Sequence, residues 1–364
     1  MPIDGFEPRY DEMAVARILA RLPVMLVPAI LLGGLVSWFG PVRMRRARRD
    51  AASCLRGTFR MRMGIGVVST LLLLVLLAGI LQSSVPMRTD EAGTVMSHGL
   101  ANPLVIMGNY NTPNNHMIHS LLVWTSIQCF GIEPWAVRLP AMIFCLACVP
   151  LIAIAASRLR SDVAGIVAAT IFVCLPSTLE LATNARGYPI VNAAMLVMIA
   201  LFPNLDRGRP GAGPLFAVVG AVGLMAVPVM VYPLGLLYSG LFIGRWRREG
   251  IAEALRCVPL AILTVFLAAT WYLPAWIAAS DDGPVGTVVR YLPVAREEGW
   301  SLAKELGKLG HWLGLASAQW VWPVGGIAAL FVLFPIALSI LVSLVRGGAV
   351  GMLAAGILVG PVAE

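Results

Sequence analysis

The chain of 364 residues is 59% hydrophobic and only 13% charged, with a mean hydropathy of +0.83. Soluble domains use about a quarter of their residues for charge, so this chain is too poor in charge to cover a water-facing surface. The net charge of +8 does not indicate nucleic-acid binding, because basic residues in a membrane protein first report topology. The six cysteines follow no metal-binding or disulfide spacing. We therefore expect an all-α integral membrane protein with several spans and no nucleic-acid partner.

Apolar runs of about 20 residues, the length that crosses a bilayer, recur along the whole chain. The run 214–244 has 31 residues and basic residues on both sides, so we expect a hairpin that crosses twice and turns near Tyr232 and Pro233. Together with this hairpin, the other runs predict a bundle of about ten transmembrane helices. The other predicted spans are 18–39, 64–84, 136–156, 163–179, 188–203, 257–279, 321–345 and 348–363.

The basic residues fall mainly in alternate connections between these spans. Seventeen of the 27 lysines and arginines do so, beginning with the arginine-rich loop 41–63. Because basic loops stay in the cytoplasm, we predict a multi-pass protein of the inner cell membrane whose N-terminus is outside. Two long extracytoplasmic loops, 85–135 and 280–320, are each expected to carry a helix that lies along the interface. Residues 1–62 then form an extra span with the arginine-rich loop, and residues 63–364 form the main transmembrane module.

Two adjacent carboxylates, Asp90 and Glu91, follow the predicted span 64–84. Adjacent carboxylates at a membrane exit can act as a general base, hold a metal or clamp an acceptor hydroxyl. They are equally consistent with the first turn of a solvated helix, where the helix dipole favours acidic residues. The residues alone leave both interpretations open.

All four histidines lie in the two predicted outer loops. His116 and His119 stand at the beginning of an apolar helix expected over 120–130, and their spacing of three lets both leave one helix face. Together with Glu91 they could hold a divalent metal, but the glutamate of a zinc protease motif is lacking. Hydrogen bonding to a substrate, with Asn115 beside them, is the favoured interpretation, and no cofactor is firmly predicted.

The short outer connection between the spans 163–179 and 188–203 carries an isolated arginine, Arg186, against the positive-inside trend. The planar donor fork of arginine suits a phosphate, although an interfacial arginine can also extend toward lipid headgroups. Tyr188 beside it either belongs to an aromatic belt or donates its hydroxyl. This connection is therefore a candidate phosphate-binding loop.

The segment from Asp90 to about Phe202 resembles the membrane-embedded GT-C glycosyltransferases. These enzymes use sugars on a lipid phosphate and include protein O-mannosyltransferases and the aminoarabinose transferase acting on lipid A. Three features in order carry the resemblance: an acidic pair after a span, a histidine-containing run leading into the next span, and a later Arg-Gly-Tyr loop that opens the next outward-to-inward helix. They are Asp90-Glu91; Asn114-Asn115-His116-Met117-Ile118-His119, continuing to Arg138-Leu139-Pro140; and Leu175-Pro176-Ser177 with Ala185-Arg186-Gly187-Tyr188.

The resemblance implies a GT-C-like hexosyl- or pentosyltransferase. It would move a sugar from a polyprenyl-phosphate donor to a glycan, lipid or protein acceptor at the extracytoplasmic face. Asp90 would accept the proton of the acceptor hydroxyl, Glu91 would assist through the acceptor or a bound metal, and Arg186 would stabilise the departing phosphate. The module 63–364 would be a short or C-terminally truncated member. The residues expected to bind the donor phosphate or other parts of the substrate are Arg186, Tyr188, His116, His119, Asn115 and Glu180.

Two other functions remain as alternatives. A transporter or flippase for a lipid-linked or polar solute predicts ionisable residues deep within spans, and the middles of the predicted spans are almost free of them. A membrane metalloprotease built on His116 and His119 would need a neighbouring glutamate, which neither histidine has.

Overall fold

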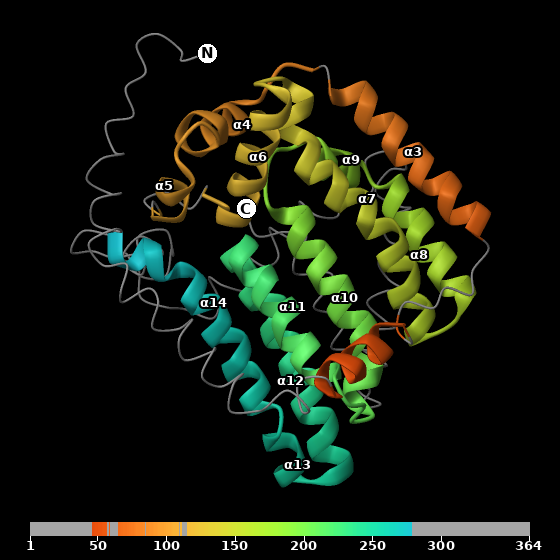
Figure 1. The fold of residues 1–364 in the computed structure, drawn as a ribbon. Helices are drawn as coiled ribbons and strands as arrows, with labels where there is room; N and C mark the ends of the chain where they lie inside the picture. Colours follow the sequence, from red (N-terminus) through yellow and green to blue (C-terminus); the bar gives the residue numbers. More distant parts are fainter. Residues whose placement is uncertain are drawn as a thin grey trace, which may run out of the picture.

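The computed structural model describes residues 46–56, 58, 65–83, 85–108, 110 and 115–278. These residues are helical with short connections, and no strand occurs among them (Figure 1). Residues 46–56 form a helix, and three further short helices are η1 (Val95–Gly99), η2 (Pro228–Met230) and α13 (Ile251–Leu255). The α-helices are α3 (Ile65–Ser83), α4 (Thr89–Thr94), α5 (Pro103–Gly108), α6 (Met117–Phe130), α7 (Pro134–Leu159), α8 (Asp162–Cys174), α9 (Pro176–Ala182), α10 (Tyr188–Asp206), α11 (Ala212–Ala226), α12 (Val231–Glu249) and α14 (Val258–Ala278).

Three helical segments among the described residues are long and apolar enough to cross a membrane: Pro134–Leu159, Tyr188–Asp206 and Ile251–Ala275. The shorter helix α8 also turns apolar side chains outward, since Val163, Val167 and Ile171 are exposed. Their spacing of four places them on one face, and a water-soluble protein rarely exposes such a stripe. Length, composition and this outward apolar face together indicate a membrane protein.

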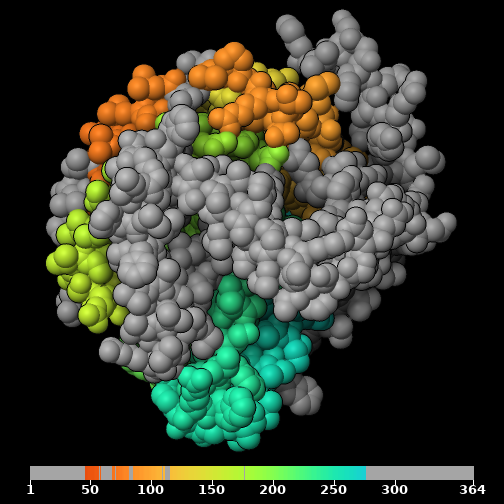
Figure 2. All heavy atoms as spheres, turned by 180° about the vertical axis from the view of Figure 1, so that it is seen from behind, coloured from red at the N-terminus to blue at the C-terminus, as the bar shows by residue number. Residues whose placement is uncertain are grey.

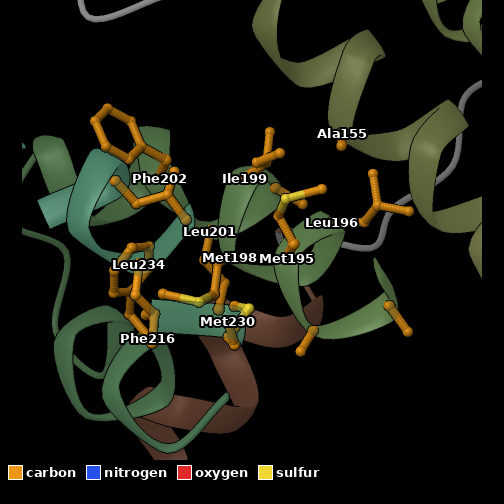
Figure 3. Close-up of a cluster of buried hydrophobic side chains, with 14 of the residues drawn as sticks. Ala155, Met195, Leu196, Met198, Ile199, Leu201, Phe202, Phe216, Met230 and Leu234 are labelled. Carbon is orange, nitrogen blue, oxygen red and sulfur yellow. The ribbon is translucent and has the colours of Figure 1, made fainter. Parts of the chain in front are cut away.

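Helix α10 is the centre of the described bundle. In its apolar window 78% of the residues are buried, against 22% in the window of Ile251–Ala275. Figure 3 shows Met198 of α10 among Phe216, Met230 and Leu234, which α11, η2 and α12 supply. Since α10 packs against α7 on one side and α11 on another, it fixes the positions of the helices that carry the site.

The bundle has two ends that differ in their residues. One end holds α4, α5 and the beginnings of α7 and α10, and we call it the Asp90 end. The other holds α13, residues 46–56 and the last turns of α7 and α10, and we call it the Arg158 end. Figures 1 and 2, drawn from opposite sides, both place the orange segment with α4 far from the blue-green segment with α13.

Four helices match the bounds of predicted spans, and two predictions need correction. The helices α3, α7, α10 and α14 match the predictions 64–84, 136–156, 188–203 and 257–279. The predicted span 163–179 was wrong as a single helix, because α8 ends at Cys174 and α9 begins at Pro176. A proline lacks the amide hydrogen and disfavours helical geometry in the residue before it, and Leu175 is accordingly extended, with φ −74° and ψ 127°.

The predicted hairpin also turns earlier than expected. The break falls at Val227, which is extended before Pro228, and not at Tyr232 and Pro233. Pro233 lies in the first turn of α12, where no amide hydrogen is needed. The absence of a side chain on Gly223 of α11 lets Met230 of η2 approach closely. A Cβ atom at this position would lie only 2.9 Å from Met230 Cγ.

The remaining predicted elements lie outside the described residues. They are the spans 18–39, 321–345 and 348–363 and the outer loop 280–320 with its interfacial helix.

Candidate functional site

The two predicted carboxylates lie in the first turn of α4 and face opposite environments. Glu91 is fully buried, whereas the side chain of Asp90 is 59% exposed. Neighbouring residues of a helix point about 100° apart, so one of the pair turns into the bundle and the other turns out of it. The predicted pair therefore divides into a buried acid and an accessible acid.

Both carboxylate oxygens of Glu91 accept two hydrogen bonds each. Oε1 accepts from Arg138 Nε at 2.8 Å and from the backbone N–H of Ala185 at 3.2 Å. Oε2 accepts from Arg138 Nη2 at 2.6 Å and from the backbone N–H of Arg88 at 2.9 Å. Four donors occupy this carboxylate, so Glu91 joins α4, α7 and the loop before α10.

Arg138 completes this network from the first turns of α7. Its Nη1 donates to the carbonyl oxygen of Val85 at 2.8 Å, and its Nη2 donates to that of Pro86 at 3.1 Å. Burial opposes the ionisation of Glu91, but the hydrogen bonds and charge of Arg138, with those of the two backbone amides, outweigh it and lower the pKa of Glu91. Glu91 and Arg138 thus form a charged, fully bonded pair inside the protein.

The accessible acid is paired with the predicted phosphate-binding arginine. Arg186 Nη2 lies 2.7 Å from Asp90 Oδ2, and the Arg186 side chain is only 12% exposed. Glu91 holds the backbone of Ala185, so the next residue along the chain, Arg186, is placed beside the residue before Glu91. The buried pair therefore positions the accessible pair.

The third predicted acid, Glu180, lies on the same surface. Its carboxylate accepts from Arg88 Nη1 at 3.2 Å, and both side chains are about half exposed. Exposed pairs of this kind contribute little to stability. The pair links α9 to Arg88, the residue before α4, and so lies close to the Glu91–Arg138 and Asp90–Arg186 pairs.

Three histidines lie buried behind Arg186. They are His98 of η1, His116 at the beginning of α6 and His119 in the first turn of α6. Burial lowers the pKa of His98 to about 4, and burial with the charge of Arg186 lowers that of His116 to about 3. Burial, with His116 as a lesser cause, lowers the pKa of His119 to about 3. All three imidazoles are therefore neutral at pH 7.

The other predicted binding residues have defined contacts. The Tyr188 ring packs edge-on against that of His116, with centroids 5.3 Å apart. Asn115 is buried, donates to the carbonyl oxygen of Ile106 at 2.8 Å and accepts from Ser120 Oγ at 3.0 Å. Asn115 thus fixes the beginning of α6, and Tyr188 places an aromatic ring against His116.

The contacts give no support to the metal alternative. Among the described residues, no group of three or more His, Cys, Asp or Glu side chains could hold a metal ion. Glu91, His116 and His119 were the predicted ligands, and the Glu91 oxygens are occupied by Arg138 and backbone amides.

Sequence reasoning missed Arg138 and His98 as parts of this site. A signal for Arg138 was present, because it is a charge within the first turns of a long apolar helix and on the side poor in basic residues. His98 had no such signal, since it stands alone in the sequence, 18 residues before His116. Only the packing of η1 against α6 brings it next to His116.

The assembled site offers an accessible carboxylate in contact with a guanidinium, backed by a buried ion pair and neutral imidazoles. A carboxylate can accept a proton and a guanidinium can stabilise a phosphate. The chain matches no protein-family model, and no curated protein or solved structure matches it. The geometry of the site is therefore the basis on which a function is proposed.

Proposed function

We propose that this protein is a membrane glycosyltransferase that moves a sugar from a polyprenyl-phosphate donor to an acceptor hydroxyl. The observation that supports it best is the 2.7 Å contact between Asp90 and Arg186. Glycosyl transfer from a lipid phosphate needs a base for the acceptor and a cation for the leaving phosphate. These two residues supply both at the end of apolar helices, where a lipid headgroup would lie.

The proposed step breaks one bond and forms one at the anomeric carbon. The acceptor oxygen attacks this carbon while the bond to the phosphate oxygen breaks, and the phosphate keeps the electron pair. The acceptor proton moves to Asp90, and Arg186 stabilises the charge that develops on the departing phosphate. Attack from the face opposite the phosphate would invert the anomeric centre.

The contact between Asp90 and Arg186 also suggests an order of events. A donor phosphate that enters the site competes with Asp90 for Arg186, because the guanidinium binds a phosphate through two parallel hydrogen bonds. Once Arg186 turns to the phosphate, the carboxylate is free to accept the acceptor proton. His116 and Tyr188 next to Arg186 are proposed to contact the sugar phosphate, with Asn115 and His119 supporting them and Glu180 at the edge.

We propose that the Asp90 end faces the extracytoplasmic side of the inner membrane and that the whole chain crosses about ten times. Positive-inside placement supports this orientation, because Arg207, Arg209 and Arg247 lie at the opposite end. The arginines Arg138 and Arg158 of α7 are separated by about 30 Å of helix, which equals the usual hydrocarbon thickness. The short helices α4 to α6 would then lie along the outer interface.

The proposal is tested by comparing envelope glycans and glycolipids of a deletion strain with its parent by mass spectrometry. The strain is then complemented with Asp90→Asn or with Asp206→Asn as a matched control, since Asp206 pairs with Arg248 at the other end. We expect Asp90→Asn to lower the missing product by about 100-fold or more and Asp206→Asn to restore it. Full restoration by Asp90→Asn, with normal insertion, would refute the assignment.

A second variant tests the phosphate role of Arg186. Arg186→Gln is expected to raise the apparent KM for the donor, lower the rate or both, because the leaving phosphate loses its cation. Arg248→Gln is the control, and both are assayed in membranes with the donor that the glycan comparison identifies. Unchanged kinetics in Arg186→Gln would remove this residue from the site.

A further inference from the structure

A second candidate binding site lies far from Asp90, between α12 and the beginning of α14. It is a groove of about 290 Å³ whose wall is largely apolar, with Phe242 and Ile243 of α12 facing Val258 and Ala261 of α14. Tyr238 also lines it, but its hydroxyl oxygen is 2.6 Å from Thr264 Oγ1 and donates to the carbonyl oxygen of Leu260 at 3.2 Å. The groove thus suits an apolar chain and not a sugar.

The groove wall continues along α12 to a tryptophan and an arginine. Trp246 and Arg247 follow the lining residues Phe242 and Ile243 by four positions and so extend the same face by one turn. The rings of Phe242 and Trp246 have centroids 6.3 Å apart, and Trp246 is 54% exposed. Tryptophan and arginine at the end of an apolar face are typical of the depth of lipid headgroups.

A second exposed arginine stands on the other wall. Arg256 directly precedes Cys257, which lines the groove, and its side chain is 72% exposed while it pairs with Glu253 at 2.7 Å. Arg248 nearby is engaged by Asp206, whereas Arg247 makes no ion pair within the described residues. The mouth of the groove therefore carries the charge of Arg247 on one wall and, on the other, an exposed Arg256 that shares its charge with Glu253.

We propose that this groove binds an anionic phospholipid. One acyl chain lies between α12 and α14, and the headgroup phosphate contacts Arg247 and Arg256. Charge complementarity supports an anionic lipid over a zwitterionic one, because basic residues at a membrane surface attract negatively charged headgroups. The site lies at the Arg158 end, so it is separate from the proposed donor site and does not depend on glycosyl transfer.

The test uses the full-length purified protein with defined lipids. Retention of phosphatidylglycerol and phosphatidylcholine with the same acyl chains is measured by native mass spectrometry. The double variant Arg247→Gln/Arg256→Gln should lower phosphatidylglycerol retention by about 30-fold, since each interfacial arginine contributes about a factor of five. The double variant Arg160→Gln/Arg209→Gln, which removes the same charge at the same end, should change it by less than about 3-fold.

A third variant tests the groove itself. Ala261→Phe narrows the groove without a change in charge and should lower retention of phosphatidylglycerol, while a thermal melt checks that the variant is folded. Equal loss in both arginine double variants, equal retention of the two lipids by the wild type, or unchanged retention in folded Ala261→Phe would each overturn the proposal.

Discussion

The Asp90 end and the Arg158 end of the bundle are both fastened by an arginine of α7, but the partners differ in charge. At the Asp90 end, Arg138 is bound by the carboxylate of Glu91, with Nη2 only 2.6 Å from Oε2. At the Arg158 end, Arg158 donates to neutral oxygens, the carbonyl of Ala200 at 3.0 Å and Oδ1 of Asn204 at 2.9 Å. One helix therefore has a buried ion pair near one end and, near the other, an arginine that donates hydrogen bonds to uncharged oxygens.

The hydrogen bonds of Arg158 and Asn204 have a structural role. Asn204 Nδ2 donates to Thr58 Oγ1 at 2.7 Å, and Arg158 Nη1 donates to the carbonyl oxygen of Thr58 at 3.4 Å. These bonds hold Thr58, and with it the arginine-rich helix 46–56, against the bundle. This attachment is made without a buried carboxylate.

The ion pair is costlier to bury than neutral groups, because two charges leave water. At the Asp90 end it holds Ala185 and so sets the contact between Arg186 and Asp90. The Asp90 end, unlike the Arg158 end, therefore keeps charged side chains in fixed positions. This is the property that the proposed chemistry needs, because preorganised charges stabilise a transition state without reorganising.

The largest effect is expected from removal of Glu91. Glu91→Ala leaves Arg138 buried without its carboxylate and should lower the free energy of unfolding by about 3–5 kcal/mol. Asn204→Ala at the other end removes hydrogen bonds but no charged side chain and should cost about 1–3 kcal/mol. Denaturant unfolding of the two variants in the same detergent measures the difference. Equal losses of unfolding free energy would contradict the proposed difference between the two ends.

A double variant separates the positioning role of Glu91 from catalysis. Glu91→Leu with Arg138→Met removes both charges and should recover most of the stability that Glu91→Ala loses. If Glu91 only positions the loop, this double variant should keep measurable transfer activity, while Asp90→Asn should not. Complete inactivity of a stable double variant would instead give Glu91 a direct role.

Acidification should loosen the Asp90 end before the Arg158 end. The unfolded chain binds protons at its histidines near pH 6.5, while burial keeps His116 and His119 neutral to about pH 3 and His98 to about pH 4. The unfolded state therefore binds more protons, so stability falls as the pH drops below 6.5, by roughly 1 kcal/mol per histidine at pH 6. The lowered pKa of Glu91 acts in the same direction at still lower pH.

Hydrogen exchange at pH 7.5 and pH 6, corrected for the intrinsic rate, measures this difference. Peptides from 94–120 should lose protection on acidification, and peptides from 196–206 should change less. His119→Phe removes one titrating group and should weaken the dependence on pH. Equal loss of protection at the two ends would contradict the assignment.

The smallest effect is expected where the arginine-rich helix meets the bundle. A Cβ atom on Gly211 would lie 2.7 Å from the backbone nitrogen of Ala51, and Gly211 has φ +81°. Gly208 is a matched control, because it also has a positive φ of +63° but nothing within 4 Å of such an atom. Both alanine variants should lose roughly 1 kcal/mol from backbone strain, and only Gly211→Ala should speed tryptic cleavage between residues 46 and 56.

Hydropathy and residue type alone predicted much of this molecule. The helices α3, α7, α10 and α14 follow from apolar runs of membrane length, and α6 from the run that begins after His119. Arg186 was selected as a candidate phosphate ligand, and Asp90 with Glu91 as a candidate acidic pair, because each is a charge next to an apolar segment; the choice of Asp90 as the base came from the family resemblance. These features are local, so they can be read from neighbouring residues.

The helix breaks were harder to predict, because the effect of a proline is only partly local. Pro176 and Pro228 end helices, whereas Pro203 lies within α10 and Pro233 lies in the first turn of α12. A proline is tolerated where its missing amide hydrogen has no partner to lose or where packing compensates. Which proline breaks a helix therefore depends on the neighbouring helices.

Only the tertiary structure decided what the two adjacent acids do. The sequence makes Asp90 and Glu91 alike, but Glu91 meets Arg138 from 47 residues away and the Ala185 amide from 94 residues away. Those partners make burial of Glu91 tolerable and leave Asp90 at the surface with Arg186. The physical reason is that the cost of burying a charge depends on the partners that folding brings to it, and no local pattern contains those partners.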